Sequence, residues 1–203
     1  MNLKLRIKQH IRENRGQYFM ISLIFLAGII VGNYKVTGLE GDVSSYLLKL
    51  VDNYLQGGVA GSLDGNSIIW GAFLSQAKIV AAIWFLGLTV IGLPLILAVV
   101  FLRGFSLGFT VGFLYQEKAL TGILISLISV LPQNLVYIPF LIMWAVIAMN
   151  FSIFIVKGRN SSVMPLGTGF ISYSILVLIF LLLFLLGAFI EAYLSPWLLT
   201  LLI

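Results

Sequence analysis

The sequence predicts an all-α membrane protein that forms a single integral membrane domain, residues 1–203. Of its residues 61% are hydrophobic and only 9% are charged, whereas about a quarter of the residues of a soluble domain are charged. The mean hydropathy is +1.11, and several apolar runs reach the length of about 20 residues that one helical crossing needs. Because so few charged side chains cannot cover a soluble globule, the composition excludes soluble enzymes, soluble binding modules and disordered tails.

The N-terminal segment, residues 1–15, is basic and comes directly before the first apolar run. Its basic residues are Lys4, Arg6, Lys8, Arg12 and Arg15. Basic residues beside a first span favour the cytoplasmic side, so we expect the N-terminus in the cytoplasm and a first transmembrane helix over 16–34. Leu3, Ile7 and Ile11 share one helical face, which predicts an amphipathic helix that lies on the cytoplasmic surface of the membrane and is attracted to anionic lipid.

Residues 35–66 form the longest polar segment and contain more acidic than basic residues, as an extracytoplasmic loop permits. Within it, apolar side chains recur on one helical face and predict an amphipathic helix over 43–55. The residues of this face that are candidates for docking a partner are Tyr46, Leu47, Leu50 and Tyr54. Two interpretations stay open, because the apolar face has to be covered in either. The helix rests on the bilayer or folds back on the spans, or it binds an extracytoplasmic partner.

The rest of the chain is divided by short polar segments into further crossings. We expect transmembrane helices over 68–91, 94–115, 135–156 and 169–194, a cytoplasmic loop at 157–168 and an outer tail at 195–203. The apolar stretch that begins at residue 119 is too long for one straight helix, and Pro132 interrupts it. We therefore expect a half-helix and a turn at 119–134. Five crossings, with the N-terminus in and the C-terminus out, satisfy the charge bias.

Three charged residues, Lys78, Arg103 and Glu191, fall inside or at the margin of the expected spans. A lone charge in hydrocarbon costs at least about 2.5 kcal/mol, so each is expected to have a partner, a wet cavity or a route to the interface. Lys78 is expected to reach the interface. Arg103 lies near the middle of its span and Glu191 about one turn from the outer end, and this difference in depth argues against a direct ion pair between them. The candidate polar residues within the membrane are Arg103, Gln133, Asn134 and Glu191.

Glycines recur every four residues in two of the expected spans. They are Gly28 and Gly32 in the first and Gly104, Gly108 and Gly112 in the third. Glycines at this spacing let another helix backbone approach closely. Packing within one chain is favoured, because five helices joined by short loops meet one another first, and a homo-oligomer stays an alternative.

The residue types that catalysis needs are missing from the expected spans. The chain has no Cys, its single His is His10 in the N-terminal segment, and no Asp lies in a span. We therefore expect no catalytic, cofactor-binding or metal-ligating residue, and we do not expect an enzyme. The net charge of +5 follows membrane sidedness and predicts no nucleic-acid partner. An alternative is a solute carrier or permease subunit with a site at the broken helix near Pro132, although few polar side chains are available to line a pathway.

Several short segments, taken in their order and spacing, resemble the stage II sporulation protein M family over essentially the whole chain, most weakly at 35–66. They lie at 12–14, 28–32, 87–92, 103–108, 131–139 and 190–196. The broader superfamily often has a Leu-Pro-His-Gly run followed by a Glu, and Gln133, Asn134 and Tyr137 stand at those places here. The resemblance therefore implies that ionisable chemistry of such relatives is lost in this chain, which weighs against a carrier. The pattern around Glu191 is retained.

The resemblance also implies a place and partners. Proteins of this family are septal membrane proteins required for engulfment of the forespore, and they assemble with stage II sporulation proteins D and P, which carry peptidoglycan-degrading activities outside the membrane. We therefore expect a non-catalytic scaffold in the bacterial cytoplasmic membrane, at the sporulation septum or the engulfing membrane. It would anchor and localise extracytoplasmic cell-wall hydrolases, with membrane lipid as its other partner.

Overall fold

The computed structural model describes residues 3–59, 65–158 and 166–200, and these ranges are helical apart from short turns and contain no strand. The helices are α1 (Leu3–Glu13), α2 (Arg15–Val36), α3 (Gly41–Val59), α4 (Gly65–Gly87), α5 (Gly92–Ser129), α6 (Leu131–Gly158), α7 (Leu166–Phe189), the π-helix η1 (Ile190–Leu194) and α8 (Ser195–Thr200). The predicted all-α fold class is confirmed.

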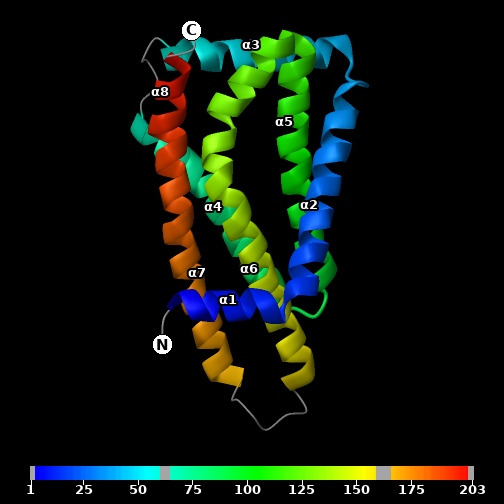
Figure 1. Cartoon of the computed structure of the whole chain (residues 1–203), viewed down its shortest axis with the longest axis vertical. Helices are drawn as coiled ribbons and strands as arrows, with labels where there is room; N and C mark the ends of the chain where they lie inside the picture. Colours follow the sequence, from blue (N-terminus) through cyan, green and yellow to red (C-terminus); the bar gives the residue numbers. More distant parts are fainter. Residues whose placement is uncertain (1–2, 60–64, 159–165, 201–203) are drawn as a thin grey trace.

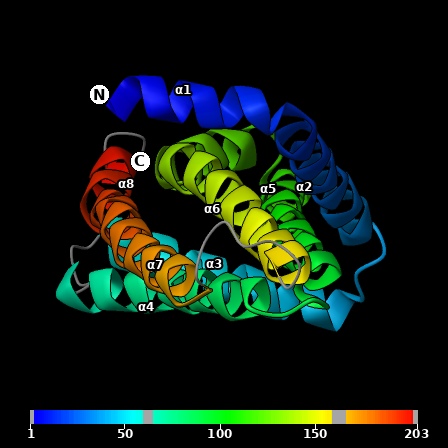
Figure 2. The ribbon, with the colours of Figure 1, turned by 90° about the horizontal axis from the view of Figure 1, so that it is seen from below.

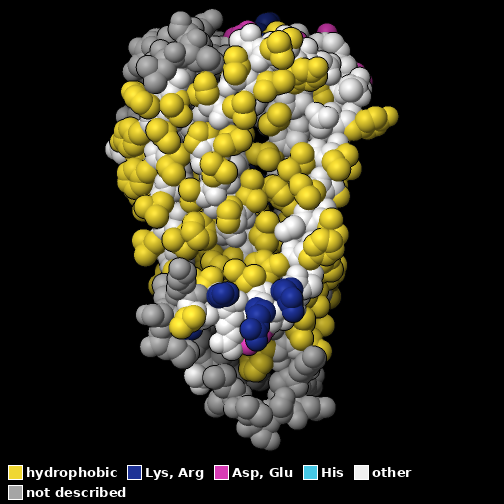
Figure 3. Space-filling model, viewed as in Figure 1, with side chains coloured by type: hydrophobic (Ala, Val, Ile, Leu, Met, Phe, Trp, Pro, Cys, Tyr) yellow, Lys and Arg dark blue, Asp and Glu magenta, His cyan; other side chains and the backbone are white. Residues whose placement is uncertain are grey.

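Five of the helical stretches are long and apolar enough to cross a membrane, as predicted. They are Arg15–Val36, Asn66–Gly87, Gly92–Ser129, Leu131–Val156 and Gly167–Leu198. They run along the long axis of the molecule, whereas α1 lies across its lower part and α3 across the opposite end (Figure 1). A broad hydrophobic band covers the middle of the visible face, and basic side chains gather on α1 below it (Figure 3). This is the surface of a multi-pass membrane protein.

The buried core is formed by residues of α2, α4, α5, α6 and α7, and α4, α6 and α7 pack side by side when the bundle is seen along its axis (Figure 2). Its centre is Trp144 of α6, which is fully buried and donates a hydrogen bond from Nε1 to the Val80 carbonyl oxygen of α4 at 3.1 Å. Tyr173 of α7 stacks on the Trp144 ring at 5.3 Å between centroids. Aromatic packing with a satisfied indole N–H therefore joins the three helices.

The helices α2 and α5 pack backbone against backbone through their two glycine rows. A Cβ atom at Gly28 or Gly32 would collide with carbonyl oxygens of α5. Conversely, a Cβ at Gly104 or Gly108 would collide with carbonyl oxygens of α2, and one at Gly112 with an α2 side chain. Both rows that the sequence singles out therefore face each other within one chain.

The chain reverses direction at Ala119, inside the continuous 38-residue range of α5. Ala119 has φ 49° and ψ −130°, and α5 turns back near the top of Figure 1. The segment 120–129 then runs back beside the first part of α5 and continues, after Val130, into α6. Residues 119–134, which were expected to form a half-helix and a turn, thus begin a helical run that is interrupted at Val130 and continues along the bundle as α6. Pro132 lies in the first turn of α6, where a helix does not need its N–H.

Two helix ends differ from the expected boundaries. The second crossing ends at Gly87, and a tight turn at 88–91 follows instead of further helix. The outer tail expected from residue 195 is helical, because η1 and α8 extend the last crossing to Thr200. Glu191 consequently lies about 13 Å from the end of this helix rather than one turn from it.

Amide side chains join α1, α2 and α6 near the end of the bundle where α1 lies. Gln17 Nε2 donates to Asn150 Oδ1 at 2.8 Å, Asn150 Nδ2 donates to Asn14 Oδ1 at 2.9 Å, and Asn14 Nδ2 donates to the His10 carbonyl oxygen at 2.9 Å. Burial lowers the pKa of the His10 imidazole, and the nearby Glu13 carboxylate acts in the opposite direction. The angle of α1 to α2 is thus held by hydrogen bonds to α6.

The Gly108→Ala substitution tests the contact between α2 and α5. The added methyl group meets the Ile29 carbonyl oxygen, and such overpacking costs about 1–3 kcal/mol. We expect a lower midpoint of thermal unfolding in detergent, followed by circular dichroism. Gly71→Ala in α4 is the matched control, because nothing lies within 4 Å of its Cβ. Equal midpoints for the two variants would contradict this packing.

The predicted orientation is tested with single cysteines in this cysteine-free chain. Ser45 in α3 and Gln9 in α1 are exposed at opposite ends of the bundle. A membrane-impermeant maleimide added to intact cells is expected to label Ser45→Cys, and to label Gln9→Cys only after the membrane is opened. Labelling of Gln9→Cys in intact cells would reverse the predicted orientation.

Candidate functional site

Three polar side chains from distant parts of the chain meet within the membrane-spanning part of the bundle. Tyr137 of α6 is only 2% exposed, and its hydroxyl donates a hydrogen bond to Glu191 Oε2 at 3.0 Å. The guanidinium carbon of Arg103 in α5 lies 5.9 Å from the centre of the Tyr137 ring, within the range of a cation–π contact. We call Arg103, Tyr137 and Glu191 the Arg–Tyr–Glu cluster.

Arg103 and Glu191 interact electrostatically across Tyr137. They do not form a direct ion pair, the only salt bridge within the described residues being Lys118 to Asp52. The expected difference in depth between the two residues is wrong, and their shared contact with Tyr137 was not predicted. Because η1 and α8 extend the last helix, Glu191 lies deep enough to reach the tyrosine that Arg103 contacts. Lys78 lies apart from this cluster and is exposed on α4.

One face of the last crossing is shaped around Tyr137. Phe184 of α7 stacks on the tyrosine ring at 5.5 Å between centroids. One turn later a Cβ at Gly187 would collide with the same ring, so only glycine leaves room for it. One turn later again, Glu191 accepts the hydrogen bond from the tyrosine hydroxyl. Positions i, i+3 and i+7 of a helix share one face. Phe184, Gly187 and Glu191 therefore contact both the ring and the hydroxyl of Tyr137 from one face of the last crossing.

A second hydrogen bond joins the same two helices one turn away. Ser195 Oγ donates to Gln133 Oε1 at 3.0 Å, and both residues are buried. Gln133 precedes Tyr137 by four residues, and Ser195 follows Glu191 by four. Since the two helices run in opposite directions, the two hydrogen bonds lie one turn apart along the same contact. We call the Tyr137–Glu191 and Gln133–Ser195 bonds the two rungs. Sequence reasoning singled out Gln133 and Glu191 but missed their partners, although the matching four-residue spacings were a usable signal.

The π-helix η1 places Glu191 and Ser195 in this register. The backbone N–H of Ser195 bonds to the carbonyl oxygen of Ile190, five residues earlier, instead of the four-residue step of an α-helix. Pro196 follows directly, and a proline clashes with the carbonyl four residues before it. A widened turn lets the helix continue past that obstacle. Such π-bulges are found frequently at functional sites.

Two cavities adjoin the cluster and share a wall made by Thr110 and Val130. The first, of about 310 Å³, reaches Glu191 and Gln133. The second, of about 130 Å³, reaches Arg103 and Asn134; the Asn134 amide also donates to its own helix, at the Val130 carbonyl oxygen. Glu191 thus lines a mainly apolar space, and Arg103 lines a smaller, mainly polar one. Within the described ranges no group of three or more His, Cys, Asp or Glu residues could hold a metal ion.

The helix α3 covers the first cavity from the end of the bundle, where Leu50 and Val51 line it. Two polar contacts fasten α3 to the end of the first part of α5. Lys118 Nζ lies 2.8 Å from Asp52 Oδ1, and Ser44 Oγ donates to Glu117 Oε1 at 2.6 Å. The helix therefore folds back on the spans, which is one of the two interpretations that its amphipathic pattern leaves open.

Part of the apolar face of α3 nevertheless stays uncovered. Tyr46 is 63% exposed and Leu50 is 48% exposed, whereas Leu47 is half-buried. The side chain of Tyr54 lies outside the described residues. The docking surface predicted from the sequence is thus exposed at Tyr46 and Leu50.

The Tyr137→Phe substitution tests the hydrogen bond at the centre of the cluster. It leaves the half-buried Glu191 carboxylate without its donor, and leaving a buried acceptor unpaired costs about 1–3 kcal/mol. We expect easier unfolding in mixed detergent micelles, measured by tryptophan fluorescence. Glu191→Gln keeps an acceptor and is expected to cost less, and the two substitutions together are expected to be non-additive. Tyr193→Phe is the control, since Tyr193 is 57% exposed on the same helix; a loss equal to that of Tyr137→Phe would contradict the assigned bond.

Comparison with known proteins identifies the family of the chain. The sequence model of the family described as stage II sporulation protein M matches residues 21–196. The match extends from α2 into α8 and includes every residue of the Arg–Tyr–Glu cluster and both glycine rows. Searches of curated proteins and of solved structures give no match. The chain therefore belongs to the stage II sporulation protein M family.

Proposed function

We propose that this protein is a non-catalytic membrane scaffold. It anchors and localises extracytoplasmic peptidoglycan-degrading enzymes, resembling stage II sporulation proteins D and P, at the sporulation septum while the forespore is engulfed. The proposal is supported by family membership and by an architecture that places nearly all of the described chain in five membrane-crossing helices and two helices lying across them.

The observation that carries the proposal is the exposed apolar surface of α3. Tyr46 and Leu50 are exposed on a helix that ion-pair and hydrogen-bond contacts hold to the bundle. A rigid aromatic and aliphatic anchor suits a protein interface, because little conformational freedom is lost when a partner binds. The negative charge bias of residues 35–66 supports an extracytoplasmic position for this surface.

The polar groups within the spans suit a structural role in such a scaffold. Tyr137, Glu191, Gln133 and Ser195 are used in bonds between α6 and the last crossing. Arg103 packs on the tyrosine ring. These bonds hold helices in register, and we propose that the protein performs no bond-breaking chemistry itself.

A solute carrier is the second candidate, and the two cavities favour it. They place Glu191 and Arg103 beside two separate spaces with a common wall, and ionisable groups within membrane spans often mark the pathway of a carrier. In reconstituted vesicles a carrier would show solute or proton flux that Glu191→Gln or Arg103→Gln abolishes. Flux that is absent across a broad solute screen would leave the scaffold as the only candidate of the two.

Pull-down of the tagged protein from sporulating membranes tests the scaffold. Replacing both Tyr46 and Leu50 with Ser removes two exposed anchors. Because interface hot spots are worth about 2 kcal/mol or more, we expect most of the cell-wall hydrolase to be lost from the pull-down. The amount of scaffold recovered is expected to stay unchanged. Tyr34→Ser is the control, because Tyr34 is 77% exposed near the same end of the bundle but lies on α2. Undiminished recovery from the Tyr46 and Leu50 variant would remove α3 as the docking surface.

A further inference from the structure

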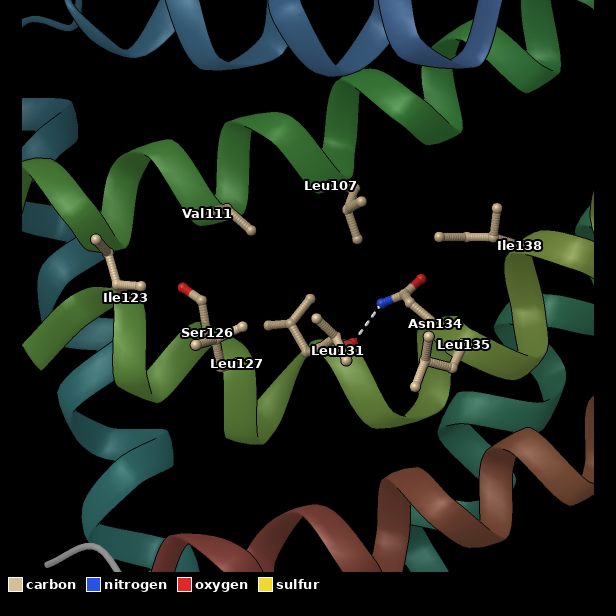
Figure 4. Close-up of a pocket in the computed structure, with 10 residues that line it drawn as sticks. Leu107, Val111, Ile123, Ser126, Leu127, Leu131, Asn134, Leu135 and Ile138 are labelled. Atoms are coloured by element: carbon tan, nitrogen blue, oxygen red, sulfur yellow. Dashed lines mark hydrogen bonds between the residues drawn. The ribbon is translucent and has the colours of Figure 1, made fainter. Parts of the chain in front are cut away.

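A lateral groove separates the first part of α5 from the run that returns past the break at Val130. One wall carries Leu107 and Val111 of α5, and the other is formed by residues 123–138. Side chains of both walls point into the space between them without meeting (Figure 4). The groove has a volume of about 270 Å³, and its lining residues on the returning run extend over about 22 Å of helix.

The groove follows from the packing already described. The glycine face of α5 is used against α2, which leaves Leu107 and Val111 pointing toward the returning run. The reversal at Ala119 and the break at Val130 set the path of the returning run. Along this path the side chains of the two walls leave a space between them. Leu127, Leu131 and Leu135 are 48%, 42% and 66% exposed at its edge. Because all these residues lie in membrane-crossing stretches, the groove opens sideways to lipid.

Water is a poor occupant of this space. Its lining is aliphatic except for Ser126 and Asn134, and the Ser126 hydroxyl and the Asn134 amide already donate to the backbone carbonyl oxygens of Gly122 and Val130. A buried water needs two to four polar partners. A transmembrane helix of a partner protein does not fit either. A helix with side chains is about 10–12 Å across, and a groove of about 270 Å³ is too small to hold it. A single flexible alkyl chain needs no polar partner and suits a small, aliphatic groove that opens to lipid.

We propose that the lateral groove is a binding site for one acyl chain of a membrane phospholipid, from the leaflet nearest α3. The chain lies along the returning run between Val111 and Leu135, and it fills space that would otherwise lack van der Waals partners. Its end reaches Leu107 and Asn134, which also line the small cavity beside Arg103. A bound lipid thus becomes part of the wall that separates the Arg–Tyr–Glu cluster from the bilayer. The proposal is independent of whether the protein is a scaffold or a carrier.

Native mass spectrometry of the full-length protein, purified in mild detergent from vesicles of phosphatidylcholine and phosphatidylglycerol, tests the site. We expect one retained phospholipid. Val111→Trp fills the groove and is expected to lose most of the retained lipid. Leu182→Trp on α7 is the control, since Leu182 is 65% exposed in a crossing that does not line the groove, and it is expected to keep the lipid. If Val111→Trp does not fold, as judged by helicity, Leu131→Trp on the opposite wall is read in its place.

A second measurement locates the chain. Phosphatidylcholine with a diazirine in one acyl chain is irradiated in the same vesicles, and the labelled residues are identified by mass spectrometry. We expect labels to concentrate on Val111, Leu127 and Leu131 above the level at Leu182, and the groove-filling variant to remove that excess. Labelling of the groove at the level of Leu182, or lipid retention unchanged in the groove-filling variant, would overturn the proposal. Retention of a free fatty acid in place of the phospholipid would overturn the assigned ligand.

Discussion

The contact between α2 and α5 is the constraint on which the other features of the bundle depend. Lipid provides no hydrophobic drive between helices, so close backbone contact has to bring them together. The two glycine rows achieve this over the second half of α2, from Gly28 beside Gly104 to Gly112 beside Asn33 near the end of α2. Once this face of α5 is committed to α2, Arg103 is directed toward α6 and Leu107 toward the lateral groove. A polar cluster and a lipid-facing groove therefore follow from the same row of missing side chains.

The two rungs between α6 and the last crossing solve a different problem. Helices in lipid slide easily past one another unless polar groups hold them in register. The Tyr137–Glu191 bond and the Gln133–Ser195 bond form together in one register only, and a shift by one turn that brought Tyr137 opposite Ser195 would leave the Glu191 carboxylate and the Gln133 amide without these partners. A charged Glu191 without a partner in the membrane is costly, so alignments of α6 and the last crossing that leave it unpaired are disfavoured. Arg103 adds a cation–π contact from a third helix to the same tyrosine ring.

Features that depend on local composition were predictable, and those that depend on exceptions to helical geometry were not. The five crossings follow from apolar length, the glycine contact from four-residue spacing, and the amphipathic α3 from periodicity. The depth of Glu191 was misjudged because Ser195-Pro196 is typical of a helix end, whereas a π turn carries the helix past the proline. The reversal at Ala119 has no glycine to mark it. The sharing of Tyr137 by Arg103 and Glu191 could not be predicted, since it depends on how three crossings pack.

The attachment of α3 has a mechanical meaning. Its two polar contacts reach Glu117 and Lys118, the residues immediately before the reversal at Ala119. A pull on α3 from outside the membrane would therefore be passed to two rigid helices at once, α5 on one side of the reversal and the returning run on the other. The load would then be distributed through the glycine contact to α2 and through the two rungs to the last crossing, so the bundle resists extraction as a unit.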